Sequence, residues 1–506
     1  MPTTMLWLPL MWLLATATAT VTLVPTPEPS PSALKLLRQS PSPPVPPRPP
    51  PSPRGDAGAP VLPPRDHPEL LPALAAPLEA TAPPSPAAPE GAPMEPSTTG
   101  NGSAAAPAPG SIRDSPGTPG PSAPPCPGDG EPAEACGEPT VEQRAAVAEA
   151  VATFALRFYQ RMAEAARPDA NLLFSPITVT MGLSHLLLGA RGETRERLAA
   201  VLAYPPGLGC VHSALRLLAT APGLFSTTQI FHHPDLHLRT RFLNESWHFY
   251  NTHPRALSGN ESLDLQRINA WVRNASRGLL PELLSTLPPE PRLVLLSAVH
   301  LQAAWLTPLD VKQTVPLPFL RPGRPPRLVP TMTSKKYPVA SFIDPHLQVQ
   351  VGRLALRGAL SLVLLLPLGP PGALGALERA LDPPALLRLL RRAASAPPRA
   401  AALALPRVRL DVPLDVVALV HDMDFGLFLD AELCGLARGP AVAVDAARHR
   451  AVLALDEAGV EAAGAMATSV ARSAPLLEAL RPFLFVLWHD SADVPVFMGR
   501  LSDPPP

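Results

Sequence analysis

Apolar residues recur at helical spacing after Val141. Val147, Val151, Phe154 and Phe158 follow one another at intervals of three or four residues, with Ala146 and Ala155 beside them. This period places the apolar side chains on one face of an α-helix. We therefore expect the folded part of the chain to begin at Val141, and the pattern predicts a further helical stretch from Leu374 to Ala393.

Short continuous apolar runs further along the chain predict β-strands. Runs of this length, rich in Leu, Val and Phe, are typical of strands buried on both faces. They span Leu293 to Leu296, Leu360 to Leu366, Leu403 to Leu410, Phe483 to Trp488, and Val496 to Arg500. Helices and strands thus alternate without an internal linker or repeat, which predicts one α+β domain over residues 141–506.

The composition before this domain differs sharply. Residues 20–140 are dominated by Pro, Ala, Ser and Gly, and the whole chain contains 73 prolines. Such a segment buries too little apolar surface to offset its conformational entropy. We expect a disordered, polyproline-like tail, with O-glycosylation on its Ser and Thr side chains as a further expectation.

The first residues predict secretion. An apolar stretch from Leu6 to Leu14 is followed by small residues up to Ala19, as in a secretory signal cleaved near Ala17 or Ala19. No later run approaches the roughly 20 apolar residues of a membrane span. The formal net charge of +0 disfavours nucleic acid as a partner. We expect a secreted, extracellular plasma protein whose signal peptide is residues 1–19.

Sequons and cysteines fit the same compartment. The sequence predicts N-glycosylation at Asn101, Asn244, Asn260 and Asn274. The cysteines, Cys126, Cys136, Cys210 and Cys434, are even in number and lack both a Cys-x-x-Cys motif and a nearby pair of histidines. Two disulfides are favoured over a zinc site. Three pairings are arithmetically open, and four buried free thiols remain the alternative.

A search for catalytic motifs is negative. The sequence contains no Gly-x-Ser-x-Gly elbow, no His-Glu-x-x-His metal motif and no phosphate-binding glycine loop. The pair His232-His233 is interpreted as a solvated turn, and Asp456-Glu457 as a solvated strand end. These observations predict a protein that is not an enzyme and that needs neither a metal nor a cofactor.

A segment near the C-terminus has an unusual composition. From Gly459 to Ser473 it is rich in small residues, carries no charge between Glu461 and Arg472, and lacks the period of an amphipathic helix. The predicted strands that start at Phe483 and Val496 follow it. We therefore expect a mobile segment that is firmly anchored at its far end.

Several motifs together resemble the serpins, the serine protease inhibitors. They are Asn171-Leu-Leu-Phe-Ser-Pro176, Leu188-Gly-Ala-Arg-Gly-Glu-Thr194, Leu293-Val-Leu-Leu-Ser-Ala-Val-His-Leu-Gln-Ala-Ala-Trp305, Pro482-Phe-Leu-Phe485 and Phe497-Met-Gly-Arg500. The resemblance covers the chain from about Val141 to Pro504. It implies a serpin fold, with a large central mixed sheet, additional sheets, surrounding helices and an exposed reactive-centre loop.

The resemblance also implies roles for single residues. The reactive bond is Arg472–Ser473, the disulfides join Cys126 to Cys434 and Cys136 to Cys210, and Trp305 lies where the loop enters the sheet. In serpins the loop inserts as a new strand after cleavage and traps the acylated protease. The implied loop hinge is Gly459, Val460, Glu461, Ala462, Ala463, Gly464 and Ala465. Gly464 and Met466 depart from the alanine and serine that are usual there.

The implied function is a monomeric suicide inhibitor of arginine-specific serine proteases. By resemblance its partners are trypsin-like enzymes: the complement component 1 proteases, plasma kallikrein and activated factor XII. Two alternatives stay open, a non-inhibitory carrier or chaperone and an interaction protein whose tail is the functional part. Heparin-like polyanions are possible partners of Arg321, Arg324, Arg327, Lys335 and Lys336, although a solvated surface also explains these charges.

Overall fold

The computed structural model describes residues 126, 134–220, 222–302, 304–370, 372–438, 442–457 and 475–504. Contacts divide the chain into two units, Met1–Ser111 and Ile112–Pro506, and every described residue belongs to the second. The expected signal peptide and nearly all of the expected Pro-rich tail lie outside the described residues. The fold can therefore be followed from the end of that tail to the C-terminus.

The first helix begins where the sequence predicts. Thr140 caps it through a reciprocal pair of hydrogen bonds: its hydroxyl accepts from the Gln143 amide, and the Gln143 side chain accepts from the Thr140 amide. This capping box satisfies backbone groups that the helix itself leaves unpaired. Val147, Val151 and Phe154 are fully buried, so the predicted face is the one that packs into the core.

Helices make up much of the N-terminal half and return between strands later. They are α1 (Val141–Ala165), α2 (Pro176–Gly189), α3 (Gly192–Val201), α4 (Val211–Leu218), α5 (Thr240–Tyr250), α6 (Glu261–Ala275), α7 (Ala373–Ala380), α8 (Pro383–Ser395) and α9 (Val416–Met423).

The helical stretch expected from Leu374 to Ala393 is present but interrupted. The chain forms two helices there, because Asp382 adopts an extended conformation and its carboxylate caps α8 by accepting a hydrogen bond from the Ala385 amide. Pro383 occupies the first turn of α8. Since a proline disfavours helical geometry in the residue before it, α7 ends at Ala380.

Five of the described strands form a mixed sheet. In spatial order they are β10 (Val408–Asp415), β11 (Ala446–Leu455), β4 (Leu293–Gln302), β2 (Leu224–His232) and β3 (Arg255–Ala256). β11 runs parallel to β4, whereas β10 and β2 run antiparallel to their neighbours β11 and β4.

A second sheet contains nine strands. Eight follow the order β1 (Leu172–Phe174), β14 (Val494–Leu501), β13 (Phe483–His489), β8 (Leu360–Pro367), β7 (Val349–Ala355), β6 (Arg324–Asp344), β9 (Arg399–Pro406) and β12 (Leu476–Glu478), and β5 (Thr314–Arg321) pairs with β6. The run from Leu403 to Leu410, expected as one strand, is divided between β9 and β10. The break falls at Arg407, where the chain passes from one sheet to the other.

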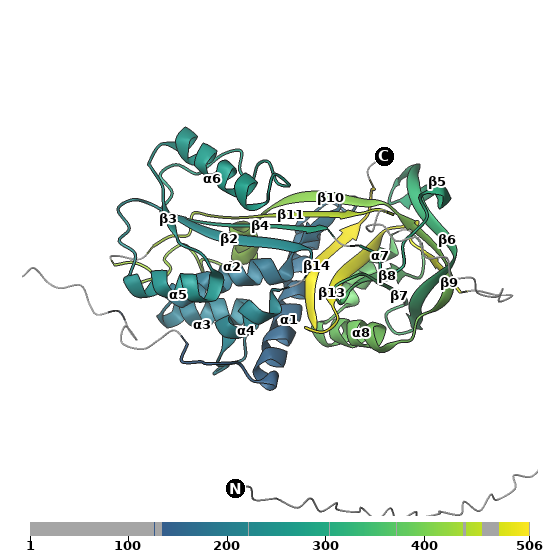
Figure 1. Ribbon diagram of the computed structural model, residues 1–506, viewed down its shortest axis with the longest axis horizontal. Coiled ribbons are helices and arrows are strands. Elements are labelled where there is room, and N and C mark those ends of the chain that lie inside the picture. Colours follow the sequence, from purple (N-terminus) through teal and green to yellow (C-terminus); the bar gives the residue numbers. More distant parts are fainter. Residues whose placement is uncertain are drawn as a thin grey trace, which may run out of the picture. The chain divides into compact units, whose positions relative to one another are not determined.

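The five-stranded sheet lies between two helical layers. In Figure 1, α6 covers one side of this sheet, and α1 to α5 lie on the other side. The burial of the strands agrees: Leu293 and Leu295 of β4 join a core cluster with α1 and α2, whereas Val294 and Leu296 join another with Ile268 of α6. Both faces of the sheet are therefore covered at β4, which is why this strand has a nearly continuous apolar sequence.

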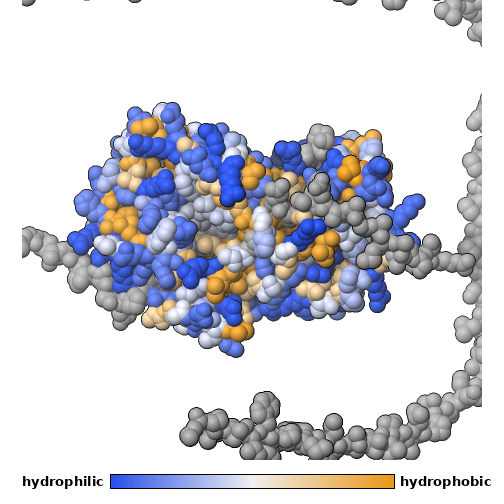
Figure 2. Space-filling model, viewed as in Figure 1, coloured by the Kyte–Doolittle hydropathy of each residue, from blue (hydrophilic) through white to orange (hydrophobic). Residues whose placement is uncertain are grey.

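The surface of the domain is mainly hydrophilic. On the face in Figure 2, apolar groups are interspersed among polar ones. Over the whole described surface, the large exposed apolar side chains include Trp247, Leu306, Leu328, Phe425 and Leu429. Within the described residues, the helices are all too short or too polar to cross a bilayer.

Candidate functional site: the junction of β4 and β11

The junction between β4 and β11, called the seam below, is the feature that sets this sheet apart. The two strands pair in parallel over nine positions, from Ala446 opposite Val294 to Ala454 opposite Gln302. Parallel pairs are normally joined through a crossover. A chain that turns back after β11 runs antiparallel to both strands of the seam. Apart from the two-residue pairing of β2 with β3, the seam is therefore the place among the described strands of this sheet where such a returning segment fits with the same polarity toward both neighbours.

A buried hydrogen bond crosses the inner face of the seam. His449 of β11 and Ser297 of β4 lie opposite each other, and His449 Nδ1 is 2.8 Å from Ser297 Oγ. His449 Nε2 accepts a hydrogen bond of 3.1 Å from the backbone N–H of Ser175. Because that amide can only donate, the proton of the neutral ring lies on Nδ1 and is donated to Ser297.

Burial keeps this imidazole neutral. His449 is 1% exposed, and desolvation lowers its pKa to about 3. The ring therefore links β4, β11 and the start of α2 without carrying a charge. Sequence analysis did not single out His449, because nothing in its local sequence distinguishes it from a surface histidine on a half-exposed strand.

Trp305 lies just beyond the end of β4, at the same end of the seam as Asp456. It is 1% exposed, and its indole N–H donates a hydrogen bond of 2.6 Å to the carbonyl of Asp456. It also forms an isolated bridge with Leu356. The residue expected near the loop entry thus connects the end of β4 to the residue directly after β11.

Glu457 corrects an expectation. Asp456 is exposed, as expected of a solvated strand end, but Glu457 is 4% exposed. Arg407 Nε lies 2.9 Å from each of its carboxylate oxygens, and Thr314 donates a further hydrogen bond. Burial alone raises the pKa of Glu457, but the hydrogen bonds from Arg407 and Thr314 outweigh it and leave that pKa below its ordinary value.

Sequence reasoning missed this arrangement because its members are far apart in the chain. Arg407 follows β9 directly and Thr314 begins β5, whereas Glu457 follows β11. The carboxylate therefore connects the end of the seam to the nine-stranded sheet. The only available signal was that an acidic residue stands one position before a long segment of small residues.

The segment expected to carry the reactive bond lies outside the described residues. This holds for Arg472, Ser473 and the whole proposed hinge, Gly459, Val460, Glu461, Ala462, Ala463, Gly464 and Ala465. Its two attachment points are described. It leaves the five-stranded sheet after Glu457 and returns at Pro475, whose carbonyl accepts a hydrogen bond from the Ala402 amide. β12 then pairs in parallel with β9.

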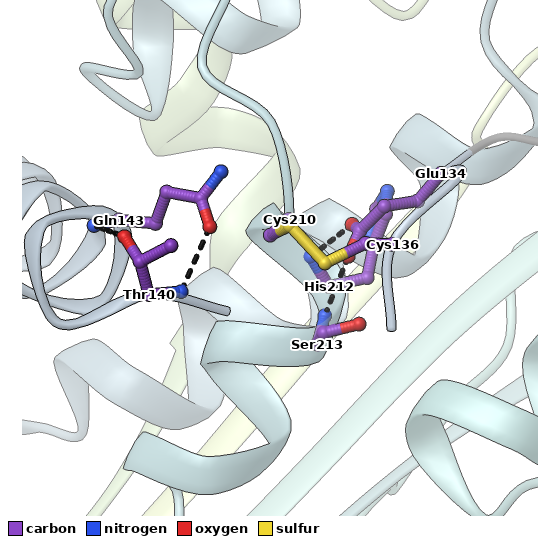
Figure 3. The surroundings of a disulfide bond; sticks show 7 residues. All are labelled: Glu134, Cys136, Thr140, Gln143, Cys210, His212 and Ser213. Carbon is purple, nitrogen blue, oxygen red and sulfur yellow. Dashed lines mark hydrogen bonds between the residues drawn. A yellow bond between two sulfur atoms is a disulfide. The ribbon is translucent and has the colours of Figure 1, made fainter. Parts of the chain in front are cut away.

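The structure contains two disulfides, Cys126–Cys434 and Cys136–Cys210. They are the pairs that the resemblance implied, and they rule out the alternative of four free thiols. Figure 3 shows that the Glu134 carboxylate lies beside the second disulfide and accepts hydrogen bonds from the backbone amides of His212 and Ser213. A carboxylate at these first amides of α4 complements the helix dipole.

This region brings together Glu134, Cys136 and Cys210, whose potential ligand atoms lie within 4.8 Å of one another. Since both sulfurs belong to the disulfide, the group offers no thiolate to a metal ion. Its role is to attach the end of the tail to α4 both covalently and electrostatically.

Three of the four sequons fall on described residues. Asn244, Asn260 and Asn274 are exposed, while Asn101 lies outside the described part. Asn244 and Asn274 lie on α5 and α6, and Asn260 caps α6 through its side-chain oxygen. These three residues therefore lie on the surface, as glycosylation requires.

The arginines considered for polyanion binding are already paired. Arg321, Arg324 and Arg327 all lie within 3.5 Å of the Asp503 carboxylate, and Arg324 also pairs with Asp169. These contacts offset much of the local charge. Two further candidates, Lys335 and Lys336, are exposed in β6.

The comparison with protein families agrees with this architecture. The model described as "Serpin (serine protease inhibitor)" matches residues 149–504. The chain belongs to the serpin family. It is a protease inhibitor of this family and not an enzyme, since similar proteins are named as inhibitors.

Comparison of amino-acid sequences finds two similar proteins that are named as inhibitors. Plasma protease C1 inhibitor of Homo sapiens is 40% identical over 361 residues, 71% of this chain and 72% of that protein. Factor XIIa inhibitor of Bos taurus is 38% identical over 374 residues, 74% of this chain and 78% of that protein. Among solved structures, human kallistatin superimposes with a TM-score of 0.65 at 26% identity, covering 72% of this chain and 99% of that one. The serpin fold expected from the motifs is confirmed.

Proposed function

We propose that this serpin is a secreted suicide substrate of arginine-specific serine proteases, with Arg472–Ser473 as the bond that the target enzyme attacks. The proposed partners are the complement component 1 proteases, plasma kallikrein and activated factor XII. Control of complement, contact activation, coagulation and fibrinolysis follows from that choice. The names of the C1 inhibitor and factor XIIa inhibitor relatives support it.

The observation that carries the proposal is the parallel seam. A segment that turns back after β11 meets two strands of the same direction, so it pairs antiparallel with both. Nine paired positions correspond to about 30 Å of strand, and the thirteen steps from Gly459 to Arg472 reach about 43 Å. The segment is long enough to fill the seam from end to end.

The composition of the segment favours this insertion. Gly459, Ala462, Ala463 and Ala465 have small side chains that enter a packed sheet without overfilling it. Gly464 adds a cost of about 0.5 to 1 kcal/mol in a strand interior. Polar groups in the uncleaved seam, such as the Ser297–His449 pair, exchange partners as the new strand enters.

The chemistry is ordinary acyl transfer up to its last step. A trypsin-like protease binds the Arg472 guanidinium, and its serine attacks the Arg472 carbonyl. The bond to the Ser473 nitrogen breaks, the new amine takes a proton, and Arg472 is left as an ester on the protease. Insertion of the freed segment then carries the ester-linked enzyme along the sheet and distorts its active site before water cleaves the ester.

Secretion and glycosylation belong to the same proposal. The apolar N-terminal stretch, the sequons at Asn101, Asn244, Asn260 and Asn274, and the two disulfides all suit an extracellular protein.

The test is covalent complex formation. The purified chain is mixed with trypsin or activated factor XII and analysed on denaturing gels. We expect a complex that survives boiling in detergent, retention of that complex in Arg472→Lys with trypsin, and its loss in Arg472→Ala. Cleavage after Arg472 without a complex would identify a substrate or carrier and contradict the proposal.

A further inference from the structure

A hollow of about 370 Å³, called the α6–β3 pocket below, lies between α6 and the edge of the five-stranded sheet. Its volume is within the range of ligand-binding pockets, roughly 300 to 1,000 Å³. The lining includes Phe231 of β2, Arg255 of β3, and Arg267, Trp271 and Asn274 of α6. Since Asn274 begins a sequon, this pocket and a predicted glycosylation site coincide.

The α6 side of the pocket is a single stripe of the helix. Arg267, Trp271 and Asn274 follow one another at intervals of four and three residues, so they lie on one face of α6. Side chains of an α-helix lean toward its N-terminus. The Asn274 amide therefore leans over the turn that contains Trp271, and a group attached to its nitrogen is directed over the indole ring.

The pocket combines an aromatic wall with two cations. Trp271 is partly buried and meets the buried Phe231 ring edge to face, with centroids 6.0 Å apart. Arg255 is exposed and has no ion-pair partner among the described residues, and Arg267 is 3.9 Å from Asp264. Guanidinium groups donate hydrogen bonds to hydroxyl and carbonyl oxygens, and an aromatic ring packs on the apolar face of a pyranose. N-acetylglucosamine, the sugar linked to asparagine in N-glycans, offers all of these groups.

The three described sequons differ in their surroundings. Asn274 is exposed, and its side chain makes no hydrogen bond within the described part of the chain. Asn260 instead caps α6, since its side-chain oxygen accepts a hydrogen bond from the backbone of that helix. Asn244 follows a turn of α5 that presents Thr240 and Arg241. Of the two sequons within helices, Asn274 is thus the one whose preceding turn carries an aromatic ring.

We propose that the first N-acetylglucosamine of a glycan on Asn274 docks in the α6–β3 pocket, against Trp271 and beside Arg255. This rests on the proposed function, because only a secreted chain carries the glycan. β3 pairs with β2 at only two positions, and exposed sheet edges are commonly protected by a cover. The docked sugar covers this edge and ties α6 to it.

The first measurement is release of glycans from the native protein by peptide N-glycosidase, followed at each site by mass spectrometry. One contact of this kind corresponds to release about 3- to 10-fold slower at Asn274 than at Asn244. Trp271→Leu and Arg255→Met should each speed release at Asn274 and leave Asn244 unchanged. Because Arg255 is exposed, its variant keeps the test valid if Trp271→Leu folds poorly. Release at Asn274 that neither variant alters would overturn the proposal.

The second measurement is hydrogen exchange of the α6 amides. We expect exchange about 3- to 10-fold faster in Asn274→Gln than in the parent chain, with Asn244→Gln as the control that leaves α6 unchanged. Asn274→Gln is preferred to a change at Ser276, because Ser276 is buried and its hydroxyl accepts a hydrogen bond from the Leu280 amide. Trp271→Leu should add less in the Asn274→Gln background than in the parent, since both changes remove one shared contact. Fully additive effects contradict docking.

These results separate the docking from the proposed function. A glycan on Asn274 that is released and exchanged as if unprotected contradicts the docking alone. An Asn274 that mass spectrometry finds without sugar contradicts both the docking and glycosylation at this site. Binding of a free heparin oligosaccharide that requires Arg255 and ignores the glycan would assign the pocket to an external ligand and overturn the docking. Slow release at Asn274 in a chain that forms no covalent complex with proteases supports the docking and contradicts only the inhibitory function.

Discussion

Glu457 illustrates how one side chain joins two sheets. Its carboxylate is 3% exposed, whereas the Arg407 side chain that pairs with it is 43% exposed. Removing the arginine therefore leaves a buried charge without its main partner, while the arginine itself is easily solvated. The cost of losing this contact is mainly the cost of leaving the carboxylate buried and charged without its partner.

We expect Arg407→Ala to lower the free energy of native unfolding by about 2 to 3 kcal/mol, the usual cost of losing hydrogen bonds to a charged group. Urea unfolding followed by fluorescence measures it. The double variant Arg407→Ala with Glu457→Gln should recover part of the loss, because the glutamine carries no charge to be desolvated. A double variant less stable than the single one contradicts this explanation.

His449 makes the stability of the native fold depend on pH. Its folded pKa of about 3 lies below the ordinary value of 6.5, so between these values the unfolded chain binds a proton that the folded chain does not. The free energy of unfolding consequently falls as the pH drops below about 6.5. His185 and His212, whose pKa values burial also lowers to about 3, act in the same direction.

The variant His449→Gln isolates this contribution. It lacks the titrating group, so its unfolding free energy should depend less steeply on pH between 6 and 4, by about 1.4 kcal/mol per pH unit. Denaturant titrations of parent and variant at several pH values provide the comparison. Parallel pH profiles for the two proteins would show that another group accounts for the dependence.

At the scale of elements, the close approach of β1 and β14 depends on a glycine. A Cβ on Gly499 would lie 2.2 Å from the Leu172 carbonyl oxygen and 2.9 Å from the Phe485 ring. The first of these is a backbone atom in a paired strand, so it moves only if β1 separates from β14. This explains physically why the C-terminal motif around Gly499 contains a glycine.

Gly499→Ala is therefore expected to destabilise the fold by about 3 kcal/mol or more, as steric overlap in a packed core does. Gly375→Ala serves as the control, since its added Cβ meets only the end of the Arg379 side chain at 3.5 Å and alanine favours the helix by up to about 1 kcal/mol. Thermal unfolding of both variants measures the contrast. Similar melting temperatures would contradict the steric argument.

Elements were predictable from sequence to the extent that their signals were local. The apolar period located α1, and the apolar runs located β4, β8 and β13. The break at Asp382 in a helical stretch and the break at Arg407 in a strand-like run were not predictable. Each depends on where the chain changes direction in the folded molecule. The contacts of Glu457 and His449 were not predictable, because their partners come from other elements and no local pattern encodes them.

For the whole molecule, the arrangement predicts a gain in stability on cleavage. If the segment after β11 fills the seam once it is cut, the five-stranded sheet gains a central strand. Such a strand contributes several kcal/mol, and each kcal/mol raises the melting temperature of a domain this large by about 2 °C. We therefore expect cleavage after Arg472 to raise the melting temperature by at least about 10 °C.

Calorimetry of the intact and the cut chain tests this expectation. A chain cut only within the Pro-rich tail is the control and should melt like the intact one. An unchanged melting temperature after cleavage at Arg472 means that the native sheet stores no energy for insertion.

The docking of β12 has a consequence for the reverse reaction. Leu477 of β12 packs where Gly352 of β7 carries no side chain, so β12 lies closely against β7 within the nine-stranded sheet. After scission, the new amine at Ser473 is only two residues from Pro475 and stays within about 7 Å of it. In the proposed insertion the acyl carbon, by contrast, travels away with the rest of the loop. Peptide-bond resynthesis by aminolysis would then lack its nucleophile, and separation of the two ends would make the cut irreversible.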